Sequence, residues 1–228
     1  MTLNQIKQAI YALYLTNKYG FKLRKVHTSE EKSRLRLEYA ETLMGSLNIA
    51  VEVENAEKLE KGGQYLVVSN HRSIIDPLII EIALQHMGVH GSWISKKELY
   101  NSFFFGVFTR NAGTILLDRE AKQMSSFFKD IKASVTEGNS IYVFPEGTRN
   151  KTDQPLSEFK DGSQIIAVKN RLPILPVYIK TNANEVLMKS LKRNAKDLKV
   201  TIEIGDMIDY KDRSRTLEEA YRQTFKIA

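Results

Sequence analysis

The sequence predicts an α/β protein in which a mostly parallel or mixed β-sheet is covered by helices and preceded by an N-terminal helical hairpin. Short apolar runs alternate with longer segments of helical spacing along most of the chain, which is the pattern of such sheets. The 228 residues, 42% of them hydrophobic, suffice to bury the core of one domain. We therefore expect an amphipathic two-helix, membrane-contact segment over residues 1–47 and an α/β domain over residues 48–228.

The N-terminal region predicts a helix over residues 3–17, a turn around Tyr19-Gly20 and a second helix over residues 29–47. Residues 1–29 carry five basic and no acidic side chains, so much of the net charge of +7 lies here. Such a run can be a solvated helix face, bind nucleic acid or lie on an anionic membrane. The membrane is favoured because tyrosines and apolar residues recur at helical spacing, namely Leu3, Ile6, Ile10, Leu13 and Tyr14.

The uncharged part of this first helix, residues 8–17, is far shorter than the roughly twenty residues that a spanning helix needs. The segment also lacks the pattern of a cleavable signal peptide. We expect it to lie on the membrane surface, without nucleic acid as a partner. The alternative is a helix that packs on the domain, and both can hold together.

The rest of the chain alternates between strand and helix. Strands are predicted at residues 49–54, 64–69, 92–95, 114–117, 140–144, 174–179 and 199–204. Helices are predicted at residues 77–87, 121–137, 162–170, 184–193 and 216–225. This alternation is the reason to expect a mixed or parallel sheet rather than a sandwich.

A histidine and a carboxylate lie five positions apart where the strand at residues 64–69 gives way to a helix. Asp76-Pro77 predicts the helix start, with Asp76 as N-cap and Pro77 at the first helical position. His71 then lies at the carboxyl end of a strand, where open α/β sheets place their chemistry. A neutral imidazole held by a carboxylate takes a proton from an alcohol near neutral pH. The alternative is that Asp76 only caps the helix and His71 is an ordinary loop residue.

A second block, Phe144-Pro145-Glu146-Gly147-Thr148-Arg149, follows another apolar strand. Together with the Asn-His-x4-Asp block at residues 70–76 it resembles the glycerolipid acyltransferases, specifically the bacterial 1-acylglycerol-3-phosphate (lysophosphatidic acid) acyltransferases. The resemblance covers about residues 48–181 and includes the segments at residues 96–99, 113–119, 159–162 and 172–177. One departure is Phe103, where many relatives carry a proline.

The resemblance implies the glycerolipid acyltransferase fold and a reaction. A fatty acyl group passes from acyl-CoA or acyl-carrier protein to the free hydroxyl of 1-acylglycerol-3-phosphate, which forms phosphatidic acid in phospholipid biosynthesis. His71, oriented by Asp76, deprotonates the hydroxyl, and no covalent acyl-enzyme is required. The resemblance also implies the substrate-binding residues. Lys96, Arg119 and Arg149 are the phosphate ligands, Glu146 and Gly147 shape the glycerol pocket, and Thr148 is a further substrate-binding residue. Lys160 and Arg72 are weaker candidates.

Other chemistries find little support. The chain has no cysteine, which excludes disulfides and a thiolate nucleophile, and it has no Gly-x-Ser-x-Gly elbow or nucleotide fingerprint. We expect no metal and no cofactor, because His86 and His90 have no supporting acidic ligand. The expected location is the cytoplasmic face of the cell membrane, as a peripheral or monotopic protein. A thioesterase or lipid hydrolase, a catalytically silent membrane-binding module, and an acyltransferase for another lysolipid or for glycerol-3-phosphate remain alternatives.

Overall fold

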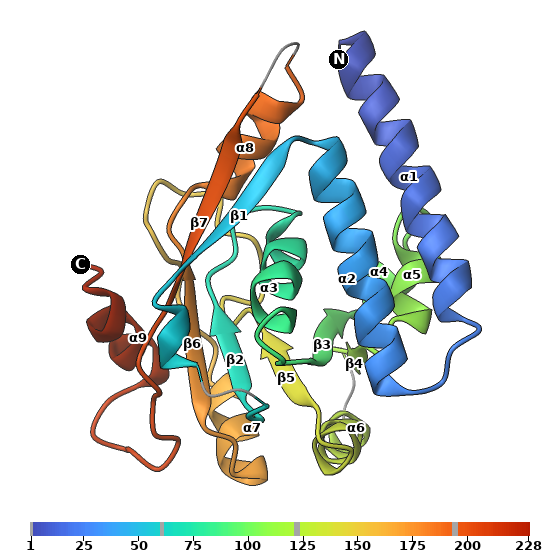
Figure 1. The fold of residues 1–228 in the computed structure, drawn as a ribbon. Coiled ribbons are helices and arrows are strands. Elements are labelled where there is room, and N and C mark those ends of the chain that lie inside the picture. The colour runs from blue at the N-terminus through green and yellow to red at the C-terminus, as the bar shows by residue number, and fades with distance from the viewer. Residues whose placement is uncertain (1, 60–61, 121–123, 193–195) are drawn as a thin grey trace.

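The structure, a computed structural model, describes residues 2–59, 62–120, 124–192 and 196–228. Over these residues a seven-stranded mixed sheet has the order β1-β7-β6-β2-β5-β3-β4 (Figure 1). Its strands are β1 (Ile49–Glu54), β2 (Leu66–Ser69), β3 (Gly91–Lys96), β4 (Ile115–Leu117), β5 (Ser140–Val143), β6 (Ile174–Ile179) and β7 (Leu198–Ile204). Every pairing is parallel except that of β6 with β7. The predicted α/β class is confirmed.

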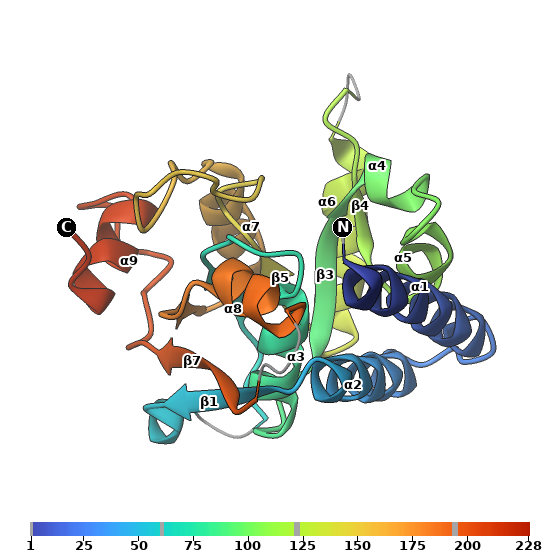
Figure 2. The same cartoon turned by 90° about the horizontal axis from the view of Figure 1, so that it is seen from above.

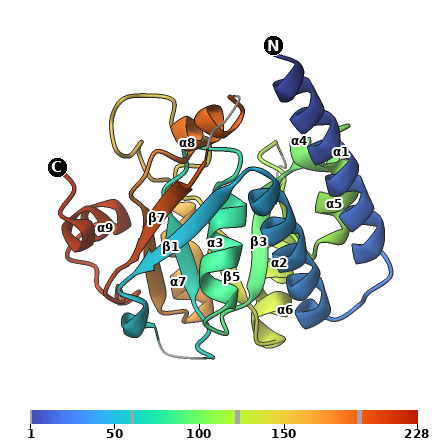
Figure 3. The same cartoon turned by 45° about the horizontal axis from the view of Figure 1, so that its top comes forward.

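Helices cover both faces of the sheet. The α-helices are α1 (Leu3–Leu23), α2 (Ser29–Ser46), α3 (Asp76–Gln85), α4 (Lys97–Tyr100), α5 (Gly106–Asn111), α6 (Ser125–Thr136), α7 (Gly162–Asn170), α8 (Ala183–Ser190) and α9 (Leu217–Phe225), and η1 (Ala56–Lys58) is a 3-10 turn. Figure 3 shows α2 and α3 in front of the sheet and α6 and α7 behind it. Alternate residues of β2 supply the two cores, because Val67 packs with the first layer while Leu66 and Val68 pack with the second.

The first helix is longer than expected. A turn at Tyr19-Gly20 was predicted, but α1 continues through both residues to Leu23. Gly20 is a contact point rather than a turn residue, because a Cβ on it would lie 2.8 Å from the amide nitrogen of Phe108 in α5. Figure 2 shows α1 lying alongside α5 at one end of the molecule, with α9 at the other. Among the described residues, no helix combines the length and apolar character needed to cross a bilayer.

The start of α3 also differs from the expectation by one residue. Ile75 is the N-cap, Asp76 is the first helical residue and Pro77 the second. Asp76 does not cap the helix, because its carboxylate accepts backbone N–H groups from the preceding loop, at Arg72 and Ser73. This correction moves Asp76 from a structural role to one within the loop of the first motif.

The other expected elements are present, with small shifts at their ends. Two strands match the prediction at both ends, β1 and β6, and so does α7. The short helices α4 and α5 were not predicted. Residues 121–123 and 193, which belong to two expected helices, lie outside the described residues.

Candidate active site

Four neighbouring parallel strands bring the predicted site residues to one edge of the sheet. β2, β5, β3 and β4 run side by side in the same direction, so their carboxyl ends meet. His71 follows β2, the second motif follows β5, Lys96 is the last residue of β3, and Arg119 follows β4. Strand order alone therefore assembles residues that are up to 78 positions apart, from His71 to Arg149 (149 − 71 = 78).

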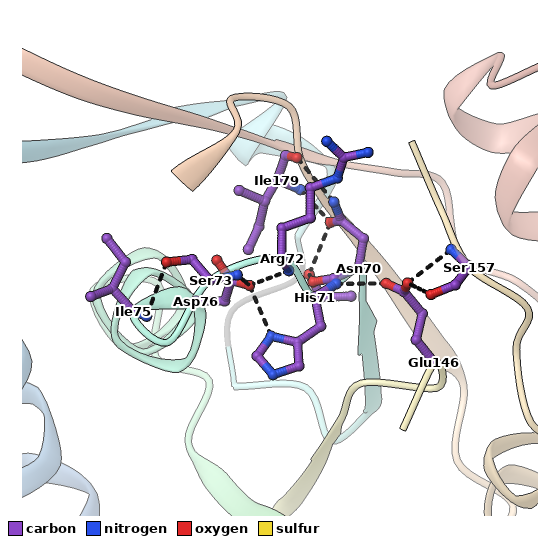
Figure 4. Close-up of polar contacts among 10 residues, drawn as sticks. Asn70, His71, Arg72, Ser73, Ile75, Asp76, Glu146, Ser157 and Ile179 are labelled. Carbon is purple, nitrogen blue, oxygen red and sulfur yellow. Dashed lines mark hydrogen bonds and ion pairs between the residues drawn. The ribbon is translucent and has the colours of Figure 1, made fainter. Parts of the chain in front are cut away.

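His71 and Asp76 form a hydrogen-bonded pair. The Nδ1 atom of His71 lies 2.8 Å from Oδ2 of Asp76 (Figure 4). The same oxygen accepts the backbone N–H groups of Arg72 and Ser73, each at 2.7 Å. A buried oxygen that accepts three hydrogen bonds is that of a carboxylate fixed in place, so Nδ1 carries the proton and Nε2 is left with its lone pair. No residue in the described ranges hydrogen-bonds to Nε2, which is the atom that can take a proton from a substrate.

Glu146 joins the two motifs. Its carboxylate is buried, with Oε1 accepting the backbone N–H of His71 at 2.7 Å. Its other oxygen, Oε2, accepts the N–H of Ser157 at 2.8 Å and also the hydroxyl of Ser157 (Figure 4). The backbone N–H of Asn150 completes the connection by donating to the carbonyl of His71 at 2.6 Å. Both Glu146 oxygens are thus engaged within the protein, a role that sequence reasoning did not foresee.

Asn70 belongs to the first motif, but the sequence interpretation assigned it no role. Its side-chain oxygen accepts the N–H of Ile179 at 2.8 Å, and its amide nitrogen donates to the carbonyl of Ile179 at 3.1 Å. This buried two-bond contact ties the start of the first motif loop to the end of β6. The available signal was its position, since an amide directly after a buried strand has to satisfy its polar groups locally.

Three of the predicted site residues, Lys96, Arg119 and Arg149, lie close enough to one another to interact electrostatically. Burial and then the positive charge of Arg119, with a smaller effect of Arg149, lower the pKa of Lys96 from its ordinary value. Lys96 is half-buried, whereas Arg119 and Arg149 are exposed. None of the three forms an ion pair within the described part of the chain. The arrangement concentrates unpaired positive charge, which an anionic group would relieve.

Gly147 is placed against one of these cations. Its carbonyl accepts a hydrogen bond from Nη2 of Arg119 at 2.9 Å, and its backbone is left-handed, with φ of 68°. A Cβ at this position would lie 2.6 Å from the same Nη2 atom and would displace the end of the Arg119 side chain, and the positive φ would strain any residue other than glycine. Thr148, next along the chain, is exposed.

The weaker candidates are engaged elsewhere. The Lys160 ammonium pairs with Glu158 at 3.1 Å, and both side chains are largely exposed. The guanidinium of Arg72 donates to the carbonyl of Gln154. Neither side chain is hydrogen-bonded to the His71–Asp76 pair, although the backbone N–H of Arg72 is.

Comparison with known proteins identifies the family of this chain. The family model described as Acyltransferase matches residues 50–180, which is more than half of the chain and includes both motifs. The chain belongs to the acyltransferase family. The resemblance inferred from the two motifs is therefore confirmed.

Curated relatives of this acyltransferase carry a common name. The chain is 34% identical over 181 residues to a 1-acyl-sn-glycerol-3-phosphate acyltransferase of Helicobacter pylori, covering 77% of this chain and 66% of the relative. It is 30% identical over 131 residues to the enzyme so named in Bacillus subtilis, covering 58% of this chain and 63% of that one. It is 35% identical over 146 residues to the alpha form of Mus musculus, covering 63% and 49%. The acyltransferase chain thus spans about half to two thirds of the length of these relatives.

A solved structure shares the fold. The crystal structure of the 1-acyl-sn-glycerophosphate (LPA) acyltransferase PlsC from Thermotoga maritima matches with a TM-score of 0.68 at 23% identity, over 97% of this chain and 92% of that one. The match includes the N-terminal helices, so the acyltransferase fold predicted from the motifs, with its helical hairpin, is confirmed.

Proposed function

We propose that this acyltransferase moves a fatty acyl group from acyl-CoA or acyl-carrier protein to the free hydroxyl of 1-acylglycerol-3-phosphate, forming phosphatidic acid. One observation carries the proposal: an imidazole with a free Nε2 lies at the same sheet edge as a group of unpaired cations. The imidazole can take the proton of a hydroxyl nucleophile, and the cations can bind a phosphate monoester. The names of the curated relatives support the same acceptor.

The proposed reaction needs no covalent enzyme intermediate. Nε2 of His71 takes the hydroxyl proton as the oxygen attacks the thioester carbonyl, and a tetrahedral intermediate forms. Collapse of this intermediate breaks the carbon–sulfur bond, and the imidazolium returns the proton to the leaving thiolate, which departs as a thiol. Asp76 supplies the negative charge that stabilises the imidazolium between these two steps.

The acceptor phosphate is assigned to Lys96, Arg119 and Arg149. A phosphate monoester carries about two negative charges near neutral pH, and guanidinium groups bind its oxygens in pairs. The lowered pKa of Lys96 reports the mutual repulsion of these cations and the loss of water around the amine, both of which a bound phosphate offsets. We assign Glu146, Gly147 and Thr148 to the same pocket as the residues that hold its second loop in place.

The outer face of α1 is proposed to lie on an anionic membrane. Leu15, Tyr19 and Leu23 on its inner face are buried, whereas the opposite face is apolar yet exposed. Four of its apolar side chains are each more than half exposed, namely Leu3, Ile10, Tyr14 and Phe21. Three lysines border this stripe, at positions 18, 22 and 25. The helix therefore packs on the domain with one face and offers an amphipathic surface with the other.

Phe103 is a further candidate for membrane contact. The three consecutive phenylalanines divide, because Phe103 is 87% exposed whereas Phe104 and Phe105 are partly buried and touch each other. An exposed large aromatic ring next to the partly exposed Leu99 suits the boundary of a bilayer. These exposed side chains support a peripheral or monotopic protein, and we propose the cytoplasmic face of the cell membrane as its location from the family resemblance.

The proposal is tested by a purified-protein assay that crosses several acceptors with both thioester donors and identifies products by mass spectrometry. Phosphatidic acid from lysophosphatidic acid is the expected product, together with one equivalent of free thiol. Arg149→Ala should raise the KM for this acceptor at least about tenfold while leaving the thioester KM unchanged, because only the phosphate contact is lost. Lys151→Ala, an exposed cation of the same loop, is the matched control. Release of free fatty acid without an ester product, or binding to liposomes without any turnover, would overturn the proposal.

A further inference from the structure

The imidazole of His71 lies flat against an aromatic ring. The ring centroids of His71 and Phe144 are 4.0 Å apart, and the two planes differ by only 9°. The hydrogen bond to Asp76 fixes one atom of the imidazole, Nδ1, but a single bond leaves the ring free to swing about its own axis. A stacked neighbour removes this freedom, because any swing drives the imidazole edge into the phenyl face.

Phe144 is itself held by a second ring. The Trp93 indole lies 5.1 Å from Phe144 at an interplanar angle of 30°, so the three rings form a continuous stack from His71 inward. Tyr142 also contacts Trp93, edge-on, at 5.0 Å and 73°. Trp93 and Tyr142 are buried, which leaves Trp93 little room to move.

The inner end of the stack is tied to a buried ion pair. Nε1 of Trp93 donates to Oε1 of Glu81 at 2.8 Å, and the same oxygen lies 2.6 Å from Nε of Arg36. Arg36 comes from α2 and also donates to the carbonyls of Gly91 and Ala112. Gln85 donates to the other oxygen of Glu81.

A buried ion pair is a poor source of stability, since the cost of removing both charges from water offsets their attraction. This ion pair instead fixes the orientation of the groups that contact it. With its hydrogen bonds satisfied, Glu81 is a fixed acceptor that holds Nε1 of Trp93 in place, while the contacts with Phe144 and Tyr142 hold the plane of the indole.

We propose that Phe144 and Trp93 are positioning residues that hold the imidazole plane of His71 in line with the acceptor hydroxyl, and that the Arg36–Glu81 pair anchors this stack to α2 and α3. The proposal rests on the proposed function, in which His71 is the general base. Geometry is the quantity at stake, because a misplacement of about 1 Å in a reacting group can lower the rate by about 10²-fold.

Phe144→Leu removes the stack while retaining an apolar side chain of similar volume. We expect kcat to fall by about 10- to 10²-fold with the acceptor KM within about twofold of wild type. Phe144→Tyr restores a flat ring and should restore kcat to within about threefold. The matched control is Phe128→Leu on α6, where the ring contacts Phe127 rather than the motif loops. Near-wild-type kcat in folded Phe144→Leu would overturn the proposal.

A spectroscopic measurement separates this inference from the proposed function. The chain has four histidines, so its histidine ring protons give few NMR signals. Protons that lie above a phenyl face are shifted upfield. We expect Phe144→Leu to move the ring-proton signals of one histidine, His71, downfield toward the chemical shifts of an unstacked histidine. If the ring-proton signals of all four histidines are the same in Phe144→Leu as in wild type, the stack is refuted, even if the enzyme is active. A wild-type protein that shows the upfield shift of the His71 signals but catalyses no acyl transfer would instead refute the proposed function.

Trp93→Phe tests the inner part of the stack, since it keeps one aromatic ring but removes the N–H donor to Glu81 together with the second ring of the indole. We expect a smaller loss of kcat in the same direction and a partial shift of the His71 signals. If both stay at their wild-type values in the folded variant, Trp93 and the ion pair do not position the imidazole.

Discussion

The backbone N–H of His71 donates to the carboxylate of Glu146 at 2.7 Å, so the proposed general base and the second motif are held together by one hydrogen bond. The bond lies between residues 75 positions apart in sequence. Glu146 is buried, and its other oxygen receives Ser157. A change at Glu146 should therefore affect the position of His71 as well as the loop that follows the second motif.

Glu146→Gln tests this connection. A glutamine presents one oxygen and one NH2 group, so either His71 or Ser157 faces a donor where it needs an acceptor. We expect the free energy of unfolding to fall by about 1–3 kcal/mol, because a buried N–H is left unpaired, and kcat to fall by at least about tenfold. Urea denaturation and steady-state kinetics measure the two effects. Glu158→Gln, a nearby carboxylate on the surface, should show neither.

His71→Ala should lower kcat by at least about 10²-fold in a folded protein, since general-base catalysis contributes roughly 10² to 10⁴. Asp76→Asn should also reduce kcat, because a neutral amide does not stabilise the imidazolium as a carboxylate does. Circular dichroism checks the fold, and His86→Ala, an exposed histidine paired with Glu41, is the control. Activity within about tenfold of wild type for folded His71→Ala would exclude His71 as the base.

The pH dependence of acceptor binding should report Lys96. Burial and the charge of Arg119 lower the pKa of Lys96 below the ordinary 10.5, whereas a bound phosphate favours its charged form. Acceptor binding is then accompanied by proton uptake at Lys96 once the pH exceeds the pKa that Lys96 has in the free enzyme. The acceptor KM should therefore rise with pH, at a lower pH than an ordinary lysine would give, by up to about tenfold per pH unit.

Lys96→Arg should remove this rise, because a guanidinium stays charged throughout the range. Lys97→Arg is the matched control, since Lys97 is exposed and hydrogen-bonded to Asp118. KM values measured from about pH 7 to about pH 10 give the comparison. An identical alkaline rise in wild type and Lys96→Arg would assign the titration to another group.

The outer face of α1 can be changed without disturbing its inner face. The triple variant Ile10→Gln, Tyr14→Gln and Phe21→Gln removes exposed apolar side chains and leaves Leu15, Tyr19 and Leu23 in place. We expect binding to anionic liposomes to weaken at least about tenfold, because each inserted side chain contributes on the order of 1 kcal/mol or more. Activity on a short-chain soluble acceptor should remain within about twofold.

Liposome flotation at several salt concentrations measures this binding, and Met207→Gln, an exposed apolar residue elsewhere, is the control. Residual binding that depends steeply on salt would reflect the lysines beside the stripe. If the triple variant binds liposomes as tightly as wild type, the membrane contact lies elsewhere, and Phe103 is the next residue to change.

The sequence predicted most of the fold because strands and helices are encoded locally. β1 alternates apolar and charged residues over residues 51–54, β6 is an apolar run, and both matched the prediction. Where a residue's role depends on a distant segment, local patterns were insufficient. Gly20 was interpreted as a turn residue because its contact with α5 cannot be read from the local sequence. The helices α4 and α5 are too short to show periodicity.

The site shows the same division. His71 and Asp76 are close in sequence, so their pairing was predictable from spacing and the family motif. The contacts of Glu146 with His71, and of Phe144 with Trp93, join segments that meet only because β2, β5 and β3 are neighbours in the sheet. The division of the chain at residues 47 and 48 remains a prediction.

The pairing of β1 with β7 has a consequence for synthesis of the chain. Ile49 pairs with Leu198, and among the described residues β7 is the only strand paired with β1, so β1 emerges from the ribosome long before this neighbour exists. β2 is likewise synthesised before β5 and β6, the two strands that pair with it. Such long-range pairing makes folding slow and leaves apolar segments exposed in the meantime. A ribosome stalled between residues 150 and 198 therefore carries the four strands of the proposed catalytic edge, whereas β1 still lacks β7.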